Sequence, residues 1–168
     1  MTVELSTVYV GVGSNLGDKL HNCTTSLQKI NQLPGCEVTA CSDIIKTEPE
    51  GVTGQDWYAN CVAEIKTTRT PFQFLKDLLA IEYDMGRVRT KRWESRIIDL
   101  DILLFGQAIM ESDNLTIPHR LLHKRRFVLE PLVQLAPDLV HPVLNVSIRQ
   151  LFNELPKESS AEVLKEET

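Results

Sequence analysis

The sequence predicts an α+β domain with one antiparallel sheet, and two observations support this prediction. Segments with the periodicity of strands and helices follow one another in the order β-α-β-β-α-β. The chain of 168 residues also has the size of one domain with a substantial core. We therefore expect a single functional domain over residues 1–156, followed by an acidic tail at residues 157–168.

The first half of the pattern begins with a strand over Val8–Val12. A turn with helix-capping residues follows at Gly13-Ser14-Asn15-Leu16-Gly17-Asp18. This turn lacks the GxxxxGK(S/T) spacing of a phosphate loop, so we interpret it as a tight turn before a helix. Pro34-Gly35 ends that helix. A second strand is expected over Val38–Ile45, and Lys46–Asp56 is a loop rich in structure breakers.

The second half of the pattern repeats this arrangement. Alternating apolar residues predict a half-buried strand over Tyr58–Thr67. Thr70-Pro71 is a typical start for the amphipathic helix that runs to Met85. The largely apolar segment Ile97–Phe105 then fits a central strand. The order matches the ferredoxin-like pattern, in which an antiparallel sheet carries helices on one face.

A C-terminal extension follows this pattern. We expect one helix around Phe127–Leu135 and another around Ser147–Leu155. The tail Pro156–Thr168 is rich in Glu, Lys and Ser and has little to bury, so we expect disorder or a frayed helix there.

Composition excludes several classes of protein. The chain has 18 basic and 23 acidic residues, a net charge of -5, which argues against nucleic-acid binding by phosphate neutralisation. No apolar run approaches the roughly 20 residues that cross a bilayer. The four cysteines show no CxxC pairing and no secretory leader precedes them, so we expect reduced, mostly buried thiols in a cytoplasmic protein: Cys23, Cys36, Cys41 and Cys61.

The sharpest chemical feature is a pair of carboxylates, Asp99 and Asp101, in the last strand of the pattern. Because they are one residue apart in a strand, both project from one face, while Ile98, Leu100 and Ile102 enter the other. Magnesium takes one or two carboxylates together with waters and substrate phosphates. A solvated polar face is the alternative interpretation, although the apolar flanks make it less convincing.

A run of cationic residues directly precedes the two aspartates: Arg87, Arg89, Lys91, Arg92 and Arg96. Arginine matches phosphate oxygens bidentately, so a polyphosphate bound through a metal would satisfy both sets of charges. A surface charge run paired with the aspartates is the alternative.

Further candidates lie elsewhere in the sequence. His119 is followed by the basic run His123-Lys124-Arg125-Arg126, which adds a second cationic arm, although a lone histidine is more often structural. Tyr58 and Phe127 offer aromatic faces, and Asn60 offers a donor and an acceptor to a heterocycle. From spacing alone, core packing explains Phe127 better.

Taken together, these motifs resemble the 6-hydroxymethyl-7,8-dihydropterin pyrophosphokinase family from about Val8 to Phe152. The resemblance rests on Gly13-Ser14-Asn15-Leu16-Gly17, Arg87-Val88-Arg89, Arg92-Trp93, Arg96-Ile97-Ile98-Asp99-Leu100-Asp101-Ile102-Leu103-Leu104-Phe105-Gly106 and Pro118-His119. It implies that ATP donates a diphosphoryl group to the pterin hydroxymethyl oxygen, with AMP as the second product. We also expect a monomer with no nucleic-acid or membrane partner.

The resemblance assigns roles residue by residue. Asp99 and Asp101 match aspartates that hold two Mg²⁺ ions bridging the ATP phosphates. The phosphate-binding and loop residues of the family, which would close over ATP, match Arg87, Arg89, Arg92, Trp93, Arg96 and Arg125. On the nucleotide side, His119, Ile102 and Glu82 match family positions.

On the pterin side, Tyr58 and Phe127 match the two rings that enclose the bicycle, which overturns the core-packing interpretation of Phe127. Asn60, Thr47 and the backbone of Pro49-Glu50-Gly51 match the groups that contact its polar edge. The chain departs from many family members at Glu94-Ser95, where Gly-Pro is common, and at Arg120, where an aromatic residue often follows the histidine.

Two rival classes share the predicted topology. A non-catalytic module that senses a nucleotide explains the architecture but not the arginines beside Asp99 and Asp101. An RNA-binding domain needs exposed stacking aromatics on the first and third strands and a basic surface, and Tyr9 is a poor substitute for them.

Overall fold

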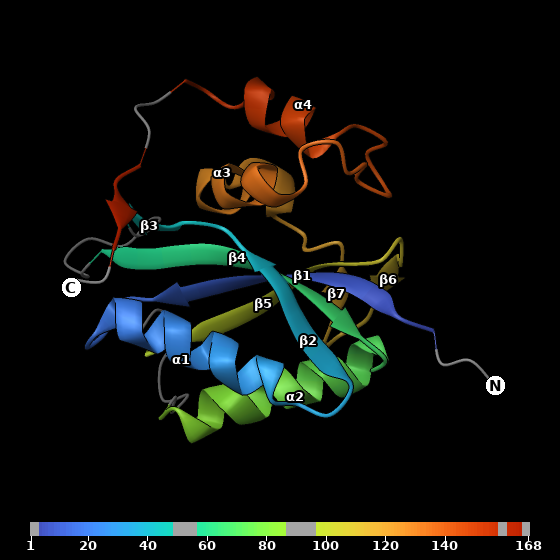
Figure 1. The fold of residues 1–168 in the computed structure, drawn as a ribbon. Coiled ribbons are helices and arrows are strands. Elements are labelled where there is room, and N and C mark those ends of the chain that lie inside the picture. The colour runs from blue at the N-terminus through green and yellow to red at the C-terminus, as the bar shows by residue number, and fades with distance from the viewer. Residues whose placement is uncertain (1–3, 49–56, 87–96, 158–160, 166–168) are drawn as a thin grey trace.

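The computed structural model describes residues 4–48, 57–86, 97–157 and 161–165 (Figure 1). An antiparallel sheet lies in the middle of the molecule, with α1 and α2 on one face and α3 on the other, and α4 packs outside α3 (Figure 1). The helix bounds are α1 Lys19–Asn31, α2 Pro71–Asp84, α3 Arg126–Leu135 and α4 Ile148–Glu154.

The main sheet has the strand order β5-β1-β4-β3-β8, and β2 also pairs with β4. The prediction of a central strand over Ile97–Phe105 was wrong, because among the described residues β5 pairs with β1 alone and forms an edge of this sheet. All of these pairs are antiparallel. The strand bounds are β1 Ser6–Ser14, β2 Cys36–Cys41, β3 Ile44–Thr47, β4 Tyr58–Thr67, β5 Asp99–Phe105 and β8 Val163–Leu164. With β2 and β3 counted as one strand, the order is that of a ferredoxin-like domain, which confirms the predicted fold.

The second predicted strand, Val38–Ile45, is divided in the structure. The main chain of Ser42 donates to the Val62 carbonyl at 2.9 Å, and the Val62 N–H donates to the Ser42 hydroxyl at 2.9 Å. The same hydroxyl donates to the Asp43 carbonyl at 3.0 Å. The Ser42 side chain therefore replaces a ladder partner, and the strand bends into β2 and β3 at this point.

Both predicted helices of the ferredoxin-like pattern are confirmed, and their caps explain where they begin. The Asp18 carboxylate accepts from the His21 N–H at 3.2 Å at the start of α1. Thr70 and Gln73 form a reciprocal capping box at the start of α2.

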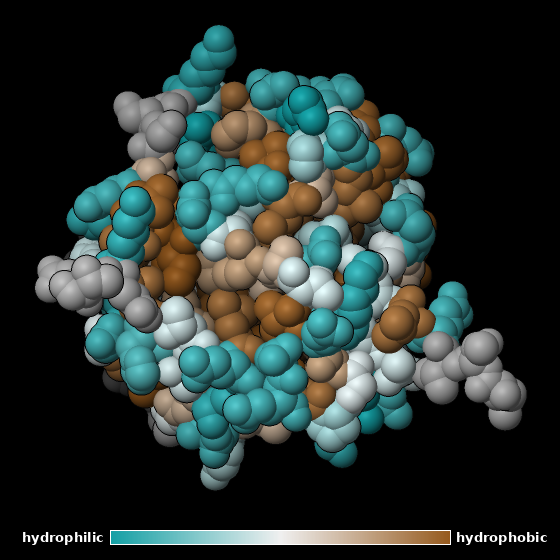
Figure 2. Space-filling view, in the orientation of Figure 1, coloured by the Kyte–Doolittle hydropathy of each residue, from teal (hydrophilic) through white to brown (hydrophobic). Residues whose placement is uncertain are grey.

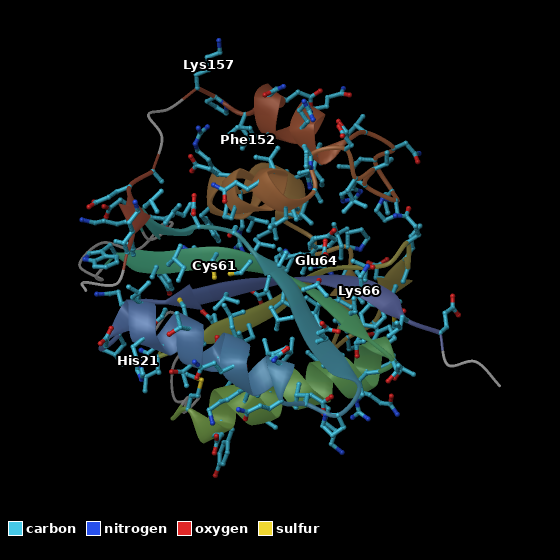
Figure 3. All side chains as sticks on the ribbon, in the orientation of Figure 1. His21, Cys61, Glu64, Lys66, Phe152 and Lys157 are labelled. Atoms are coloured by element: carbon cyan, nitrogen blue, oxygen red, sulfur yellow. The ribbon has the colours of Figure 1, made fainter. Side chains whose placement is uncertain are left out.

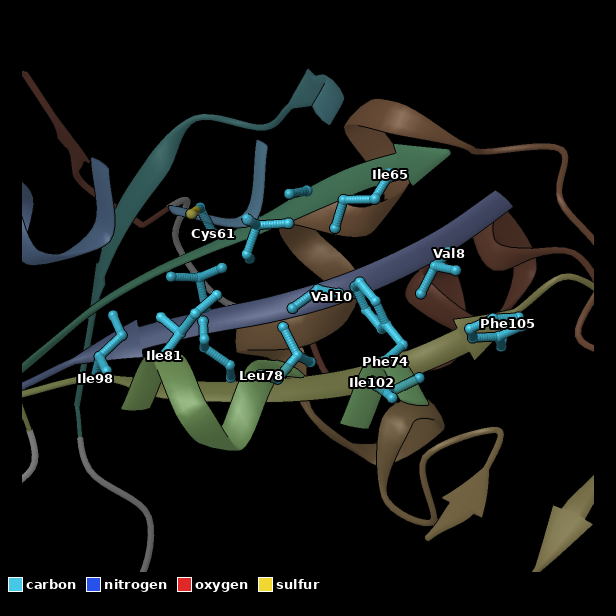
Figure 4. Packing of buried hydrophobic residues seen from close by; sticks show 14 of the residues in the cluster. Val8, Val10, Cys61, Ile65, Phe74, Leu78, Ile81, Ile98, Ile102 and Phe105 are labelled. Atoms are coloured by element: carbon cyan, nitrogen blue, oxygen red, sulfur yellow. The ribbon is translucent and has the colours of Figure 1, made fainter. Parts of the chain in front are cut away.

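Two hydrophobic clusters cover the two faces of the sheet, whereas the prediction placed helices on one face only. The cluster under α1 and α2 includes Val8, Val10, Phe74, Leu78 and Ile81, and Figure 4 shows their side chains meeting between β1 and α2. The second cluster lies under α3 and α4 and is formed by Tyr9, Val62, Leu103, Leu129 and Ile148, among others. The helices of the C-terminal extension therefore cover the second face.

This second layer also changes the environment of β4. The prediction of a half-buried strand was wrong, because Cys61 faces the α1 side, Val62 faces the α3 side, and both are buried. The extension helices α3 and α4 confirm the predicted segments, and Figure 3 shows Phe152 of α4 next to α3. The Arg126 guanidinium lies 5.0 Å from the Phe152 ring centroid and helps to join the two helices.

The tail differs from the expectation of disorder or a frayed helix, because Val163–Leu164 forms β8 and pairs with β3. An edge strand presents unpaired main-chain groups, and this short segment satisfies some of them. All four cysteines are free thiols as predicted, although Cys41 is exposed and Cys36 is half-buried.

The surface in Figure 2 carries hydrophilic side chains over much of its area, with apolar residues visible between them. Within the described ranges, none of the helices combines the length and the apolar character needed to cross a membrane.

Candidate active site

A cleft of about 910 Å³ lies over the ends of β1, β4 and β5 that α3 leaves uncovered, and it extends past the β5 edge of the sheet to α2. Strands β1, β4 and β5 line its floor, α2 lines one wall, and the segment 114–121 and the start of α3 line the rest. One end of the sheet face toward α3 therefore forms the cleft, and the other end of that face is buried under α3.

Two glycines of β1 make this floor flat. Gly13 lies between Asp99 of β5 and Asn60 of β4, and Gly11 lies between Asp101 and Val62. A Cβ at Gly13 would stand 2.7 Å from the Asn60 Oδ1 atom, so the Asn60 amide would have to move to make room for it. Glycine at this position therefore leaves the row from Asn60 to Asp99 open without displacing Asn60, over a distance of about 10 Å across two strand spacings.

The predicted geometry of the two aspartates is confirmed. Asp99 and Asp101 both line the cleft, Asp101 exposed and Asp99 half-buried. Leu100 and Ile98 are buried in the cluster under α1 and α2, as the alternation of a strand requires. Among the residues that the structure describes, no three acidic, histidine or cysteine side chains gather as a metal site.

Glu82 of α2 lies directly behind the two aspartates and is only 3% exposed. Its Oε2 atom accepts a hydrogen bond from the Leu100 N–H at 2.8 Å, the main-chain group between Asp99 and Asp101. A buried carboxylate bonded to a main-chain N–H is a strong restraint. Glu82 therefore fixes β5 against α2 at the position that sets the direction of both aspartates.

Those residues predicted to bind the pterin that the structure describes meet at one end of the cleft: Thr47, Tyr58, Asn60 and Phe127. Tyr58 begins β4 and Phe127 lies in the first turn of α3, and both are half-buried and line the cleft. The Asn60 Nδ2 atom donates to the Thr47 hydroxyl at 2.5 Å, so β3 holds the amide in one orientation. The Arg125 guanidinium lies 5.3 Å from the Phe127 ring centroid. Phe127 also packs against the second cluster, so it serves both the core and the cleft.

His119 follows a short hairpin, β6 Met110–Glu111 with β7 Thr116–Ile117, and a cis bond between Ile117 and Pro118. Its N–H donates to the Leu103 carbonyl at 2.9 Å, which holds it beside β5. Its ring Nδ1 atom accepts from the Leu121 N–H at 3.1 Å. The proton of the neutral ring therefore lies on Nε2, where the ring is a donor.

Electrostatics keeps this ring neutral. Burial lowers the pKa of His119 from its ordinary value of 6.5, and the neighbouring Asp101 carboxylate opposes this shift. The guanidinium groups of Arg125 and Arg120 lower the pKa further. A neutral histidine near two arginines and an aspartate is suited to donate a hydrogen bond to an anionic oxygen.

Comparison with known proteins shows which family the chain resembles. The family model described as 7,8-dihydro-6-hydroxymethylpterin-pyrophosphokinase (HPPK) matches residues 9–137. The chain belongs to the HPPK family. The matched region contains β1 from Tyr9 onward, all the described residues of the cleft and the start of the extension.

Curated relatives agree with this assignment. A 2-amino-4-hydroxy-6-hydroxymethyldihydropteridine pyrophosphokinase from Haemophilus influenzae is 42% identical over 136 residues, 81% of this chain and 85% of that protein. The protein of the same name from Methylorubrum extorquens is 41% identical over 81% of this chain and 86% of its own length. The folic acid synthesis protein fol1 of Schizosaccharomyces pombe is 39% identical over 89% of this chain, which spans 20% of that longer protein.

Solved structures support the fold. The Plasmodium falciparum HPPK-DHPS structure with pteroate aligns with a TM-score of 0.73 and 17% identity. The alignment covers 90% of this chain and 42% of that chain. At this identity the likeness concerns the architecture of the HPPK domain alone.

The structure adds an apolar wall that sequence reasoning did not single out. Leu75 and Leu79 of α2 line the cleft together with Phe72, although the buried positions of α2 are Phe74, Leu78 and Ile81. Phe72 is 50% exposed and Leu79 is 42% exposed. Large apolar residues on the outer face of an amphipathic helix were the signal that could have revealed this wall. Ile102 of β5, predicted near the nucleotide, also lines the cleft.

Several predicted HPPK site residues lie outside the described residues: Arg87, Arg89, Arg92, Trp93, Arg96, Pro49, Glu50 and Gly51. The residues that flank the arginine segment are described. A Cβ at Gly86 would stand 3.1 Å from the Ile97 Cδ1 atom. The residues just after α2 and just before β5 therefore lie next to each other, near Glu82 and Asp99.

Proposed function

We propose that the chain transfers the diphosphoryl group of ATP to 6-hydroxymethyl-7,8-dihydropterin and produces AMP and the pterin diphosphate. The observation that carries this proposal is the order of groups along one cleft. Aromatic and amide groups lie at one end, two carboxylates lie in the middle, and an apolar wall with a neutral histidine lies at the other end. The names of the curated relatives support the same reaction.

The pterin occupies the end formed by Tyr58, Asn60 and Phe127. Two aromatic rings from different elements suit the two faces of a flat bicycle. The Asn60 amide and the Thr47 hydroxyl are already bonded to each other and face the polar edge of the heterocycle. With the bicycle over Gly13, the hydroxymethyl arm extends along the row toward Asp99.

Asp99 and Asp101 hold magnesium in this proposal, with two ions expected when ATP is bound. Two adjacent carboxylates without a third protein ligand among the described residues fit a cation that completes its shell with water and phosphate oxygens. When bound, the metal neutralises charge on the phosphates during transfer. The protein contributes the spacing of the carboxylates, and Glu82 contributes their direction.

The nucleotide occupies the opposite end. Leu75, Leu79 and Ile102 offer an apolar surface for the base. His119 presents its Nε2–H as a donor for a ribose or phosphate oxygen. Glu82 acts here through the β5 backbone, and its predicted contact with the nucleotide remains a proposal.

In the reaction, the hydroxymethyl oxygen attacks the β-phosphorus in line. A bond forms between this oxygen and the β-phosphorus, the bond from the β-phosphorus to the α–β bridging oxygen breaks, and AMP leaves with that oxygen. The hydroxyl proton passes to solvent. Positioning and charge stabilisation supply most of the rate enhancement in such transfers, so a strong protein base is not required.

Cations complete the site in this proposal. Arg125 lies beside Phe127 at the boundary between the pterin and the phosphates. Arg87, Arg89, Arg92, Trp93 and Arg96 would contact the phosphates and exclude water, as the family resemblance implies. We further propose a cytoplasmic monomer in which the residues that contact the substrates all lie within residues 1–156.

The test is AMP formation from ATP, magnesium and 6-hydroxymethyl-7,8-dihydropterin, measured by separation of the nucleotides. The proposal predicts AMP that depends on both the pterin and the metal. The matched controls omit the pterin or replace magnesium with EDTA. ATP binding without AMP in the complete mixture would contradict the proposal and favour the nucleotide-sensing alternative.

A further inference from the structure

The C-terminal strand β8 covers the outer edge of β3. Ile44 pairs with Leu164, and Ile45 pairs with Val163. The Lys46 N–H donates to the Glu162 carbonyl at 2.9 Å, and the Ala161 N–H donates to a carboxylate oxygen of Glu130 in α3 at 3.4 Å. Figure 1 shows the red arrow of β8 next to β3. The tail therefore joins β3 to α3 from outside the sheet.

The register shows which main-chain groups of β8 point toward β3. Since Lys46 bonds Glu162, Ile45 and Val163 are a pair without direct hydrogen bonds in the antiparallel ladder. Ile44 and Leu164 are then the hydrogen-bonded pair. The N–H of Leu164 faces β3, and the N–H of Val163 faces away from it. The Leu164 side chain also packs against the cluster under α1 and α2.

The inner edge of β3 holds the pterin end of the cleft. Ile45 pairs with Asn60 and Thr47 pairs with Tyr58, so β3 meets β4 at the residues proposed to contact the pterin. The Thr47 hydroxyl accepts from the Asn60 amide. A strand of four residues that pairs on one edge only is weakly held. β8 therefore adds a second hydrogen-bonded edge to the strand that orients Asn60.

Lys46 shows how closely this edge is restrained. Its main chain bonds to β8, and its ammonium lies 5.2 Å from the centroid of the Trp57 ring. The ammonium of Lys19 lies 4.0 Å from the same centroid. Trp57 directly precedes Tyr58, so the two ammonium contacts with the Trp57 ring also restrain the chain next to Tyr58 at the pterin end.

We infer that β8 is a positioning element for the pterin end of the cleft. It acts through β3, Thr47 and Asn60, and it makes no contact with the nucleotide end. This inference rests on the proposed function for the identity of the ligand. It predicts that loss of β8 weakens binding of the pterin and leaves use of ATP unchanged.

The experiment compares two proline variants of the full chain. Leu164→Pro removes the N–H that faces β3, whereas Val163→Pro places the same rigid ring at an N–H that faces away. Leu164→Ile keeps both the N–H and an apolar side chain and serves as the conservative rescue. Pterin affinity is measured from pterin fluorescence with a non-hydrolysable ATP analogue bound, and KM and kcat are measured by AMP release.

For Leu164→Pro we expect the pterin dissociation constant and KM to rise about fivefold to tenfold, the effect of losing one or two hydrogen bonds. The KM for ATP and kcat stay unchanged, and Val163→Pro and Leu164→Ile behave like the natural chain. Equal pterin affinity in Leu164→Pro and Val163→Pro, with both chains folded, would overturn the inference. Weakened pterin binding in a chain that forms no AMP would refute the proposed reaction and leave the positioning role of β8 standing.

Discussion

Strands β1, β4 and β5 use alternate residues of the same segments for different purposes on the two faces of the sheet. In β1, Val8, Val10 and Val12 are buried under α1 and α2, whereas Gly11 and Gly13 open the floor of the cleft. In β5, Leu100 enters the core, and Asp99 and Asp101 face the cleft. The alternation of side chains along each strand therefore separates residues that stabilise the fold from residues that line the cleft. Substitutions on the two faces should therefore have separable effects.

The separation between packing residues and cleft residues does not extend to the opposite end of this sheet face. There Tyr9 is 6% exposed, and its hydroxyl donates to a carboxylate oxygen of Glu64 at 2.8 Å. Figure 3 places Glu64 on β4. Burial raises the pKa of Tyr9 above its ordinary value, and the Glu64 contact adds to this shift. This part of the face contributes to packing, whereas the end with the two glycines forms the floor of the cleft.

The largest effect is expected for Asp101→Asn on the cleft face. The change removes a charge from the proposed magnesium site while keeping nearly the same shape. We expect turnover to fall about a thousandfold or more, because metal-assisted charge stabilisation is lost. The melting temperature should stay close to that of the natural chain, since Asp101 is exposed. Near-normal AMP formation would reject the metal assignment.

Ile65→Ala tests the opposite face of β4. Ile65 is fully buried under α1 and α2, away from the cleft, so its truncation should lower the free energy of unfolding by about 2–5 kcal/mol. Urea denaturation measures this loss. Activity per folded molecule should be unchanged, and a loss of activity without a loss of stability would break the separation of the two faces.

Glu82→Ala tests the connection between the faces. The substitution leaves the Leu100 N–H without its carboxylate partner, which should lower stability by about 1–3 kcal/mol. It should also reduce kcat, because the direction of both aspartates depends on this bond. Glu82→Gln retains an acceptor oxygen and should recover most of kcat. If alanine and glutamine give equal kcat values, the positioning role is wrong.

Gly13→Ala and Gly11→Ala form a matched pair on the floor. The added methyl at Gly13 collides with Asn60 Oδ1, whereas at Gly11 it meets Leu103 at an ordinary 3.5 Å. We expect the KM for the pterin to rise about tenfold in Gly13→Ala, from displacement of one polar contact, and much less in Gly11→Ala. Steady-state kinetics with varied pterin checks this. Equal effects would show that Asn60 does not set the pterin affinity.

The smallest effect concerns pH. Burial lowers the pKa values of His119 and His141 from 6.5, and the nearby His123 lowers that of His141 further. Because the unfolded chain binds these protons more readily, stability is complete above about pH 6.5 and decreases as pH falls through the folded pKa values. His141→Gln should reduce the decrease in melting temperature between about pH 7 and about pH 5. An unchanged pH profile would contradict this.

Periodicity and capping residues were sufficient to predict much of this fold. β4 begins and ends at the predicted Tyr58 and Thr67, and α2 begins at the predicted Pro71. The pairing of Asp99 with Asp101 on one face followed from alternation and was confirmed. These features are local, because each depends only on residues within one element.

The features that sequence reasoning missed depend on contacts between distant segments. β8 has two residues and no periodicity, and it forms only because β3 offers an open edge more than a hundred residues earlier in the chain. The burial of Val62 depends on the packing of α3, which the strand itself does not encode. The role of Gly13 appears only when Asn60 and Asp99 are placed on either side of it.

The most direct test of the proposed diphosphoryl transfer is phosphorus NMR of the complete reaction with ATP, magnesium and 6-hydroxymethyl-7,8-dihydropterin. Transfer of the diphosphoryl group should give equal amounts of AMP and of a pterin that carries both transferred phosphorus atoms. Formation of ADP with a pterin monophosphate would contradict transfer at the β-phosphorus. An unchanged ATP spectrum would contradict the catalytic role of the cleft.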